Sequence, residues 1–217
     1  MLHILDHENT VLNTFISELR DVNRQTDSMR FRRNLERAGE IMAYEISKTF
    51  DYAPSAVETQ LGEAEMLLPQ NTVVIATILR AGIPYHQGFL NYFDRAQNAF
   101  VSAYRKYSKD GTFNIKVEYI QCGDLADKTL ILVDPMLATG SSAVLTYKAL
   151  IEKGGIPAHT HIATVVASEE GIDYVKKHMP MAKTSIWCGA VDQELTVKSY
   201  IVPGIGDVGD LAYGEKL

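Results

Sequence analysis

Ile-Leu-Val-Asp-Pro-Met-Leu-Ala-Thr-Gly-Ser-Ser, residues 131–142, is the stretch of sequence that decides the fold. The apolar run 130–133 is too short for a buried helix and predicts a buried strand. It ends at one carboxylate, Asp134, and small and hydroxyl-bearing residues follow. Apolar residues then recur at helical spacing over 141–153. The loop therefore precedes a helix N-terminus, where free N–H groups and the helix dipole favour a phosphate.

The pattern of this loop narrows the kind of phosphate. It lacks the lysine of a Walker loop, and it lacks the Gly-x-Gly-x-x-Gly of a dinucleotide site. Asp134 stands five residues before Thr139, where it can reach the hydroxyl groups of a sugar whose phosphate lies in the loop. The stretch predicts a site for a phosphorylated sugar. Taken alone, it is also compatible with an ordinary helix cap after a core strand.

These residues resemble the phosphoribosyl pyrophosphate motif of the type I phosphoribosyltransferases. The broader family usually carries two adjacent acids, whereas here Pro135 occupies the second place. Asp-Pro-Met-Leu-Ala-Thr-Gly is similar to the version found in uracil phosphoribosyltransferases. The resemblance implies that phosphoribosyl pyrophosphate contacts residues of four regions, namely Arg80, Arg105, Asp134, Pro135, Met136, Leu137, Ala138, Thr139, Gly140, Ser141, Ser142 and Asp207.

Composition limits the class of protein. The chain has 217 residues, of which 46% are hydrophobic and 22% charged, as expected for one globular domain over 1–217. A net charge of −6 argues against generic binding to nucleic acid or to an anionic membrane. Two cysteines without metal-ligand spacing, and no signal-peptide pattern or membrane-length apolar run, indicate a cytoplasmic protein.

Strands alternate with helices along the chain. Helical spacing predicts helices at 11–20, 28–50, 83–93, 141–153 and 169–178. Apolar or alternating runs predict strands at 72–79, 100–104, 113–120, 130–133, 159–167 and 184–188, with weaker candidates at 57–61 and 65–68. The predicted fold is α/β, an open and mainly parallel twisted sheet flanked by helices. To it are added a helical arm (1–50), a β-hairpin flap (100–122) and a C-terminal hood (189–217), whose residues 200–214 match neither helix nor strand.

Two arginines are candidates for binding a diphosphate. Arg80 ends the strand 72–79 and is followed by two small residues, Ala81 and Gly82, where a guanidinium can bind a diphosphate with paired donors. The family resemblance implies that role, with a non-proline cis peptide at or near this loop. Arg105 resembles the second such arginine, reached from the flap. An ordinary surface ion pair and a solvated basic hairpin are the respective alternatives.

The tail 200–210 carries a second resemblance. Its glycines permit positive φ and expose backbone N–H and C=O groups, which can read the edge of a planar base. It is similar to the family's Pro-Gly-x-Gly-Asp-Ala-Gly-Asp signature, with Val208 in place of the alanine. This resemblance implies uracil binding by Ile201, Gly206, Asp207 and Val208. The extra bulk of Val208 is expected to tighten the base pocket or to reduce the tolerance of substituted uracils.

The resemblance implies transfer of a phosphoribosyl group from phosphoribosyl pyrophosphate to uracil. Arg80, Arg105, Asp134 and Asp207 are the expected catalytic residues. Asp207 is also an expected ligand of Mg²⁺, which is held mainly through the substrate pyrophosphate and water. A homodimer or higher homo-oligomer is expected, without a nucleic-acid or membrane partner. An RNA-binding regulator that senses pyrimidine nucleotides, and a transferase for another nucleobase, remain as alternatives.

Overall fold

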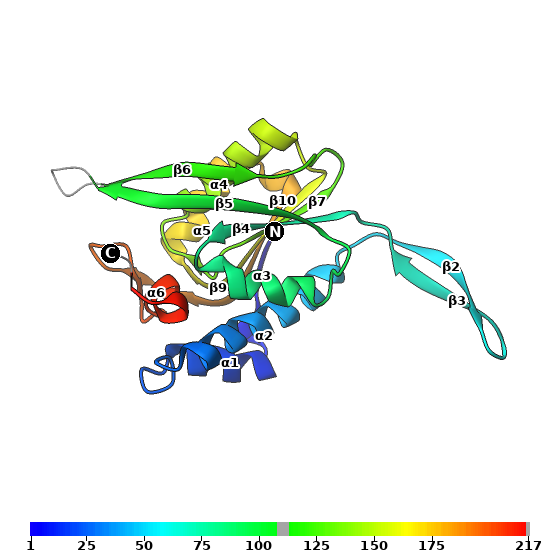
Figure 1. Ribbon diagram of the computed structural model, residues 1–217, viewed down its shortest axis with the longest axis horizontal. Coiled ribbons are helices and arrows are strands. Elements are labelled where there is room, and N and C mark those ends of the chain that lie inside the picture. The colour runs from blue at the N-terminus through cyan, green and yellow to red at the C-terminus, as the bar shows by residue number, and fades with distance from the viewer. Residues whose placement is uncertain (108–112, 216–217) are drawn as a thin grey trace.

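The computed structural model describes the backbone of residues 1–107 and 113–215, and all their side chains except those of 103–107 and 113–117. Within these residues, an eight-stranded sheet forms the centre of the molecule and helices cover both of its faces (Figure 1). The predicted α/β class is confirmed.

The strands of the main sheet have one dominant direction. In spatial order they are β1 (Leu2–Ile4), β10 (Thr184–Asp192), β9 (His159–Ser168), β7 (Thr129–Val133), β4 (Val73–Leu79), β5 (Gln97–Tyr107) and β6 (Phe113–Gln121), with β8 (Met136–Leu137) paired to β9. Among the described pairs of this sheet, β5 with β6 is antiparallel and the others are parallel. All five residues of β7 are buried, as a central parallel strand requires.

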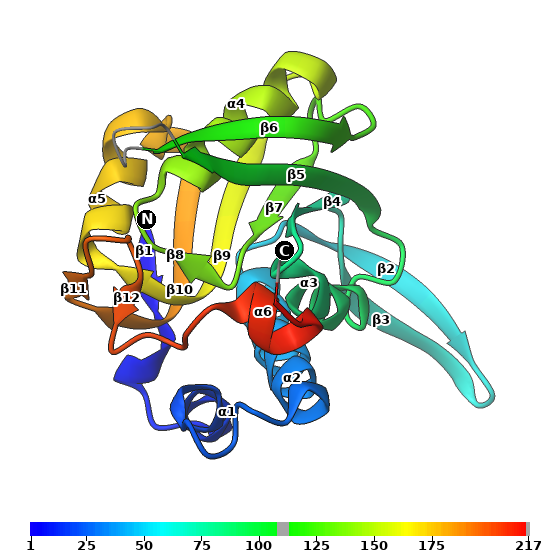
Figure 2. The same cartoon turned by 60° about the vertical axis from the view of Figure 1, so that its left-hand side comes forward.

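Side chains of β7 alternate between two hydrophobic clusters. Ile131 and Val133 pack in the cluster that contains residues of α1 (Val11–Arg20), α2 (Ser28–Ser47), α3 (Gly82–Leu90) and α6 (Val208–Tyr213). Leu130 and Leu132 pack in the opposite one, with α4 (Ser141–Gly154) and α5 (Glu169–His178). Figure 2 shows α6 between the α1–α2 pair and the main sheet. One face thus carries the helical arm and the C-terminal helix, and the other carries the helix after the predicted phosphate loop.

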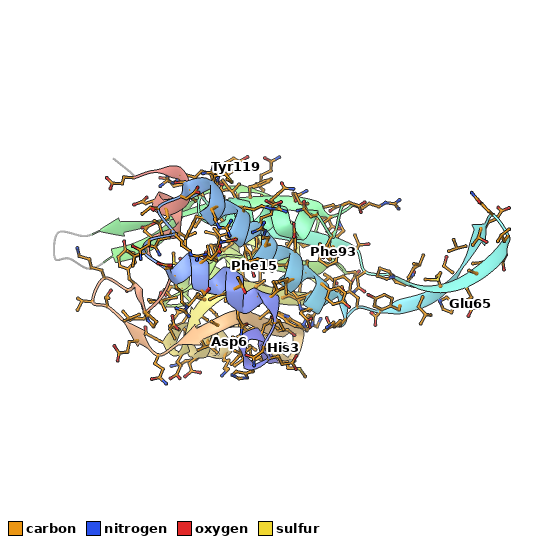
Figure 3. The ribbon with its side chains drawn as sticks, turned by 90° about the horizontal axis from the view of Figure 1, so that it is seen from below. His3, Asp6, Phe15, Glu65, Phe93 and Tyr119 are labelled. Carbon is orange, nitrogen blue, oxygen red and sulfur yellow. The ribbon has the colours of Figure 1, made fainter. Side chains whose placement is uncertain are left out.

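Two small hairpins and two short helical turns complete the described chain. The hairpin of β2 (Tyr52–Thr59) and β3 (Gly62–Pro69) forms a separate sheet that projects from the body, as the position of Glu65 in Figure 3 shows. β11 (Glu194–Leu195) pairs with β12 (Ile201–Val202), and the 3-10 turns are Leu5–His7 and Met181–Lys183. The weak strand candidate at 65–68 is therefore confirmed within β3, whereas the one at 57–61 is corrected, because β2 begins at Tyr52 and residues 60–61 form the turn of this separate hairpin.

Several predicted bounds are corrected by the structure. The helix predicted for 28–50 ends at Ser47, and the strand predicted for 184–188 continues to Asp192. β1 was not predicted, because its three residues become a strand only by pairing with β10. The expectation of neither helix nor strand over 200–214 is wrong, because β12 and α6 lie there. In α6, Val208 and Ala212 are both fully buried, so packing rather than propensity stabilises this six-residue helix.

Two further expectations concern cysteines and membranes. Cys122 and Cys188 are both free thiols. Throughout residues 1–107 and 113–215, no helix has both the length and the apolar character that crossing a bilayer requires.

A buried carboxylate joins the two helices of the arm. Glu18 of α1 is only 6% exposed and accepts hydrogen bonds from Arg30 and Asn34 of α2, at 2.7, 2.8 and 2.6 Å. Arg24 adds an ion pair at 2.7 Å. The hydrogen bonds from Arg30 and then from Asn34 lower the pKa of Glu18 to about 2. The ionised carboxylate is therefore the form that holds α1 on α2.

We predict that Glu18→Gln lowers the free energy of unfolding by about 2 kcal/mol at pH 7, because the charged acceptor of several hydrogen bonds is lost. The pKa of Glu18 is lowered in the folded state, so its contribution is present above the unfolded pKa of 4.5 and disappears as pH falls towards about 2. The difference in denaturant midpoint between the wild type and the variant should therefore disappear as pH falls from 4.5 to about 2. Glu45→Gln, which removes an exposed ion pair with Lys48, is the control with little effect. A gap independent of pH would contradict the assignment.

Candidate active site

A cavity of about 720 Å³ opens at the carboxyl ends of β4 and β7. Its walls come from three separated parts of the chain. The first part consists of the end of β4, the loop that follows it and one residue of β5, namely Ile78, Leu79, Arg80, Ala81 and Ser102. The second part follows β7 and consists of Asp134, Met136, Leu137, Ala138, Thr139, Gly140, Ser142 and Ala143. The third part is the C-terminal segment, with Ser199, Tyr200, Ile201, Asp207, Gly209 and Asp210. The loop after the central strand and the C-terminal tail therefore face one cavity, as the sequence predicted.

The topology explains why the cavity lies there. β4 and β7 are adjacent parallel strands, but the chain leaves β4 for β5 on one side and β7 for β9 on the other. The helices that follow them, α3 and α4, lie on opposite faces of the sheet. Such a switch point leaves a crevice at the carboxyl edge, which is where α/β proteins bind ligands.

The loop before α4 has the geometry of a phosphate site. Gly140 is the N-cap residue of α4 and has a φ of 75°. Because glycine has no side chain, no side-chain hydrogen bond from this position caps the first turn of the helix. Thr139 Oγ1 accepts from the N–H of Ser141 at 3.4 Å and donates to the Ser141 hydroxyl at 3.2 Å. A Cβ on Gly140 would lie 2.6 Å from the carbonyl oxygen of Gly171 in α5. The position therefore requires glycine for its backbone conformation and for its close approach to α5.

Asp134 follows β7 at the start of this loop. Its N–H donates to the carbonyl of Ala163 at 3.1 Å, and its Oδ1 lies 3.4 Å from the N–H of Met136. The carbonyl of Pro135 accepts from Val165 and Val166, both at 3.1 Å. The sheet thus holds the backbone of Asp134 and Pro135 and presents the Asp134 carboxylate at the cavity.

Arg80 lies across the cavity from this loop. The peptide bond between Leu79 and Arg80 is cis, as the family resemblance implied for this position. The Arg80 Nη2 donates to Oδ1 of Asp210 at 2.9 Å, and both terminal nitrogens lie 3.3 Å from the Gly214 carbonyl oxygen. The guanidinium therefore binds oxygen acceptors of the C-terminal segment, and a diphosphate offers acceptors of the same kind.

Asp207 has a structural role besides any chemical one. It is the N-cap of α6, where its Oδ1 accepts from the N–H of Asp210 at 3.1 Å, and its Oδ2 lies 3.4 Å from the Tyr200 hydroxyl. Gly206 before it has φ of 75°. The cap holds the Asp207 carboxylate at the wall of the cavity.

Some predicted site residues do not line the cavity. Pro135 and Ser141 of the phosphate loop are absent from its walls, as are Gly206 and Val208 of the tail. The expectation that the bulk of Val208 narrows the base pocket is wrong, because its side chain is fully buried in the cluster beneath α6. Its backbone remains beside the cavity-lining Asp207. The side chain of Arg105 lies outside the described residues, although its backbone is part of β5, which pairs with β6 up to Tyr107 and Phe113.

Sequence reasoning missed several lining residues. Asp210 belongs to the glycine-rich motif and stands three residues after Asp207, the spacing that brings an N-cap and its third helical residue together. Tyr200 begins the same stretch. Ser102, in contrast, carried no signal, since only the pairing of β5 with β4 brings it beside Leu79.

The fold and the cavity together define a class of protein, namely an α/β protein with a ligand-sized cleft at the carboxyl edge of its sheet and a C-terminal segment along one wall of that cleft. The family model described as uracil phosphoribosyltransferase matches residues 6–215. A uracil phosphoribosyltransferase of Porphyromonas gingivalis is 58% identical over 213 residues, covering 98% of each chain. One of Pyrococcus furiosus is 40% identical over 203 residues, covering 92% of this chain and 84% of its own.

The chain belongs to the uracil phosphoribosyltransferase family. This confirms the resemblance noted at residues 134–142 and 200–210. Among solved structures, that of the AQ2163 protein from Aquifex aeolicus shares the fold, with a TM-score of 0.87 at 24% identity over 100% of both chains.

We predict that Gly140→Ala destabilises the protein by about 3 kcal/mol, the sum of a left-handed backbone for a residue with a Cβ and of crowding against α5. Chemical denaturation measures the change. Gly123→Ala is the control, because the nearest atom to a Cβ there is a side-chain oxygen at 3.8 Å. A loss below about 1 kcal/mol at Gly140 would show that the loop relaxes without α5.

Proposed function

We propose that this protein transfers the phosphoribosyl group of phosphoribosyl pyrophosphate to uracil, giving uridine monophosphate and pyrophosphate. One observation carries the proposal. A single cavity is lined by the N-terminus of α4, by Arg80 and by the glycine-rich C-terminal segment. The guanidinium of Arg80 can bind a diphosphate with paired donors. Its volume of about 720 Å³ is in the range of small-molecule sites.

The phosphoribosyl substrate is placed by the loop after β7 in this proposal. The N–H groups and hydroxyls of residues 138–142 hold the 5′-phosphate at the positive end of α4. Asp134, at the cavity wall, accepts hydrogen bonds from the ribose hydroxyls. Arg80 exchanges its contacts with Asp210 and Gly214 for the diphosphate. Arg105, reached from β5, is the proposed second diphosphate ligand.

The base lies against the C-terminal segment in this proposal. Uracil presents an acceptor, a donor and an acceptor along one edge. Backbone groups of Ile201 and of Gly206, Asp207 and Val208 complement that order, and cytosine would place a donor against a donor.

The reaction breaks the bond between C1′ of the ribose and an oxygen of the diphosphate. The N1 atom of uracil forms the new bond to C1′, with inversion at that carbon, and its proton passes to the departing pyrophosphate or to solvent. Positive charge develops on the ribose ring, as in glycoside chemistry. Asp134 and Asp207 stabilise this charge, and the arginines stabilise the negative charge on the departing diphosphate.

Magnesium fits the donor set of the cavity. The carboxylates of Asp134, Asp207 and Asp210 line it, and Mg²⁺ is held by few carboxylates together with phosphate oxygens and water. Within the described residues there is no cluster of three or more His, Cys, Asp or Glu suited to a metal. We therefore assign Asp207 as the ligand, with the remaining ones from substrate and water. When bound, the cation supplies further neutralisation of the diphosphate charge.

We also propose one domain over 1–217 and a homo-oligomeric assembly. The arm, flap and hood boundaries are those given above. The projecting β2–β3 hairpin supports the assembly, because its apolar side chains Leu61, Met66 and Leu67 are 100%, 50% and 63% exposed.

We predict pyrophosphate release with uracil and phosphoribosyl pyrophosphate, at least about 10³-fold faster in kcat/KM than with cytosine, adenine or hypoxanthine. Unpaired buried donors and acceptors cause the rejection of the other bases. A coupled pyrophosphate assay over the four bases makes the measurement. Equal turnover of a purine would assign the protein to another base.

We predict that Asp207→Asn lowers kcat by about 10²-fold or more and changes the affinity for phosphoribosyl pyrophosphate only a few fold. Asparagine is as good an N-cap as aspartate, so α6 keeps its start while the charge is removed. Single-turnover rates and equilibrium binding separate the two quantities. Asp173→Asn, at an exposed pair with Lys176 in α5, is the control. An unchanged rate would remove Asp207 from the mechanism.

A further inference from the structure

The C-terminal segment 199–214 forms a wall of the cavity without joining the main sheet. Its strand β12 pairs with β11 in a sheet of its own. Its distance from the phosphate loop is therefore set by packing and by side-chain contacts. Figure 2 shows where they come from, since α6 lies beside α2 of the helical arm.

The first contact is at Gly204, three residues before Asp207. Arg20, the last residue of α1, binds both carboxylate oxygens of Asp192 at 2.8 and 2.9 Å and the Gly204 carbonyl at 3.0 Å. The N–H of Gly204 donates to the same carboxylate at 2.9 Å. The Asp192 side chain is only 7% exposed and that of Arg20 24%. Both polar groups of the Gly204 backbone are thus held by one buried, bidentate ion pair.

The second contact is at the other end of α6. Arg32 of α2 donates from Nη1 to the carbonyl oxygen of Ala212 at 2.6 Å, and its guanidinium lies 5.9 Å from the centre of the Tyr213 ring. This carbonyl belongs to the last turn of α6, where oxygens have no partner within the helix and a cation is favourable. Arg33, the next residue, instead forms an exposed ion pair with Glu36.

Three residues of the cavity wall lie between these two contacts. Asp207, Gly209 and Asp210 line the cavity, whereas Arg20, Arg32 and Asp192 do not. The phosphate loop starts α4, which packs on the opposite face of the sheet from α1 and α2. The arm therefore binds the C-terminal wall directly through Arg20 and Arg32, whereas it meets the phosphate loop only through the shared hydrophobic cluster, against which Met136 and Ala138 pack.

We propose that Arg20 and Arg32 are positioning residues for base binding, which hold the two ends of 204–212 so that the backbone of 206–208 meets the edge of uracil. The inference rests on the proposed function, because it assigns the base to this wall. It gives the helical arm a part in base selection, although the arm does not touch the base. Loss of either arginine loosens the base-binding wall and leaves the phosphate loop in place.

The test compares Michaelis constants of Arg20→Met, Arg32→Met and the control Arg33→Met. Methionine keeps the apolar stem and removes the donors. Arg20→Lys is added because it retains the charge without the bidentate fork, and it carries the test if Arg20→Met does not fold. Pyrophosphate release gives KM for uracil and for phosphoribosyl pyrophosphate separately, and thermal unfolding records stability.

We expect KM for uracil to rise about tenfold in Arg20→Met and about threefold in Arg32→Met, with Arg20→Lys in between, while KM for phosphoribosyl pyrophosphate stays within about twofold. Arg33→Met should match wild type. Equal rises of both constants, a fall in thermal stability with both constants unchanged, or an equal effect of Arg33→Met would each overturn the positioning role. Wild-type protein that does not turn over uracil would overturn the proposed function itself, and this role with it.

Discussion

The site depends on one constraint of the fold. Two neighbouring parallel strands, β4 and β7, are followed by helices that pack on opposite faces of the sheet. β4 and β7 pair along their length, yet α3 packs with one hydrophobic cluster and α4 with the other. The carboxyl ends of the strands consequently remain uncovered by helices. Asp134 and Arg80, which end these strands, are brought to one cavity by this pairing. The sheet order therefore brings these two side chains together, although they are 54 positions apart in the sequence.

The opposite wall of the cavity is built on a different principle. The C-terminal segment contributes main-chain groups and carboxylates, and it is held by apolar burial of Ile205, Val208 and Ala212 together with arginines from three elements. Arg80 differs from Arg20 and Arg32 in this respect, because it faces the cavity and binds a carboxylate that also lines it. The ion pair of Arg80 with Asp210 is partly exposed, and such pairs contribute little to stability.

Much of this architecture was readable before the structure. The long apolar strands and the amphipathic helices were predicted within a few residues, and α1 and α5 start and end where the periodicity placed them. Each of these elements buries one face, so the spacing of its own apolar residues is enough to predict it. The failures are short elements. β1 exists because the backbone of Met1 to Ile4 pairs with β10, and α6 exists because Val208 and Ala212 fill the core against α2. Neither stabilising partner is near in sequence.

The sequence by itself determined the strand, loop and helix at 129–154, the glycine at 140 and the acid at 134, because backbone conformation and burial at these positions depend on neighbouring residues. It also carried the family resemblance, since the motifs at 134–142 and 200–210 are contiguous. Only the tertiary structure decided that Val208 points into the core, that Asp210 meets Arg80, and that Arg20 and Arg32 reach the C-terminal segment. These contacts join residues 130 to 184 positions apart, and such pairs are selected by packing of the whole sheet, which no local pattern encodes.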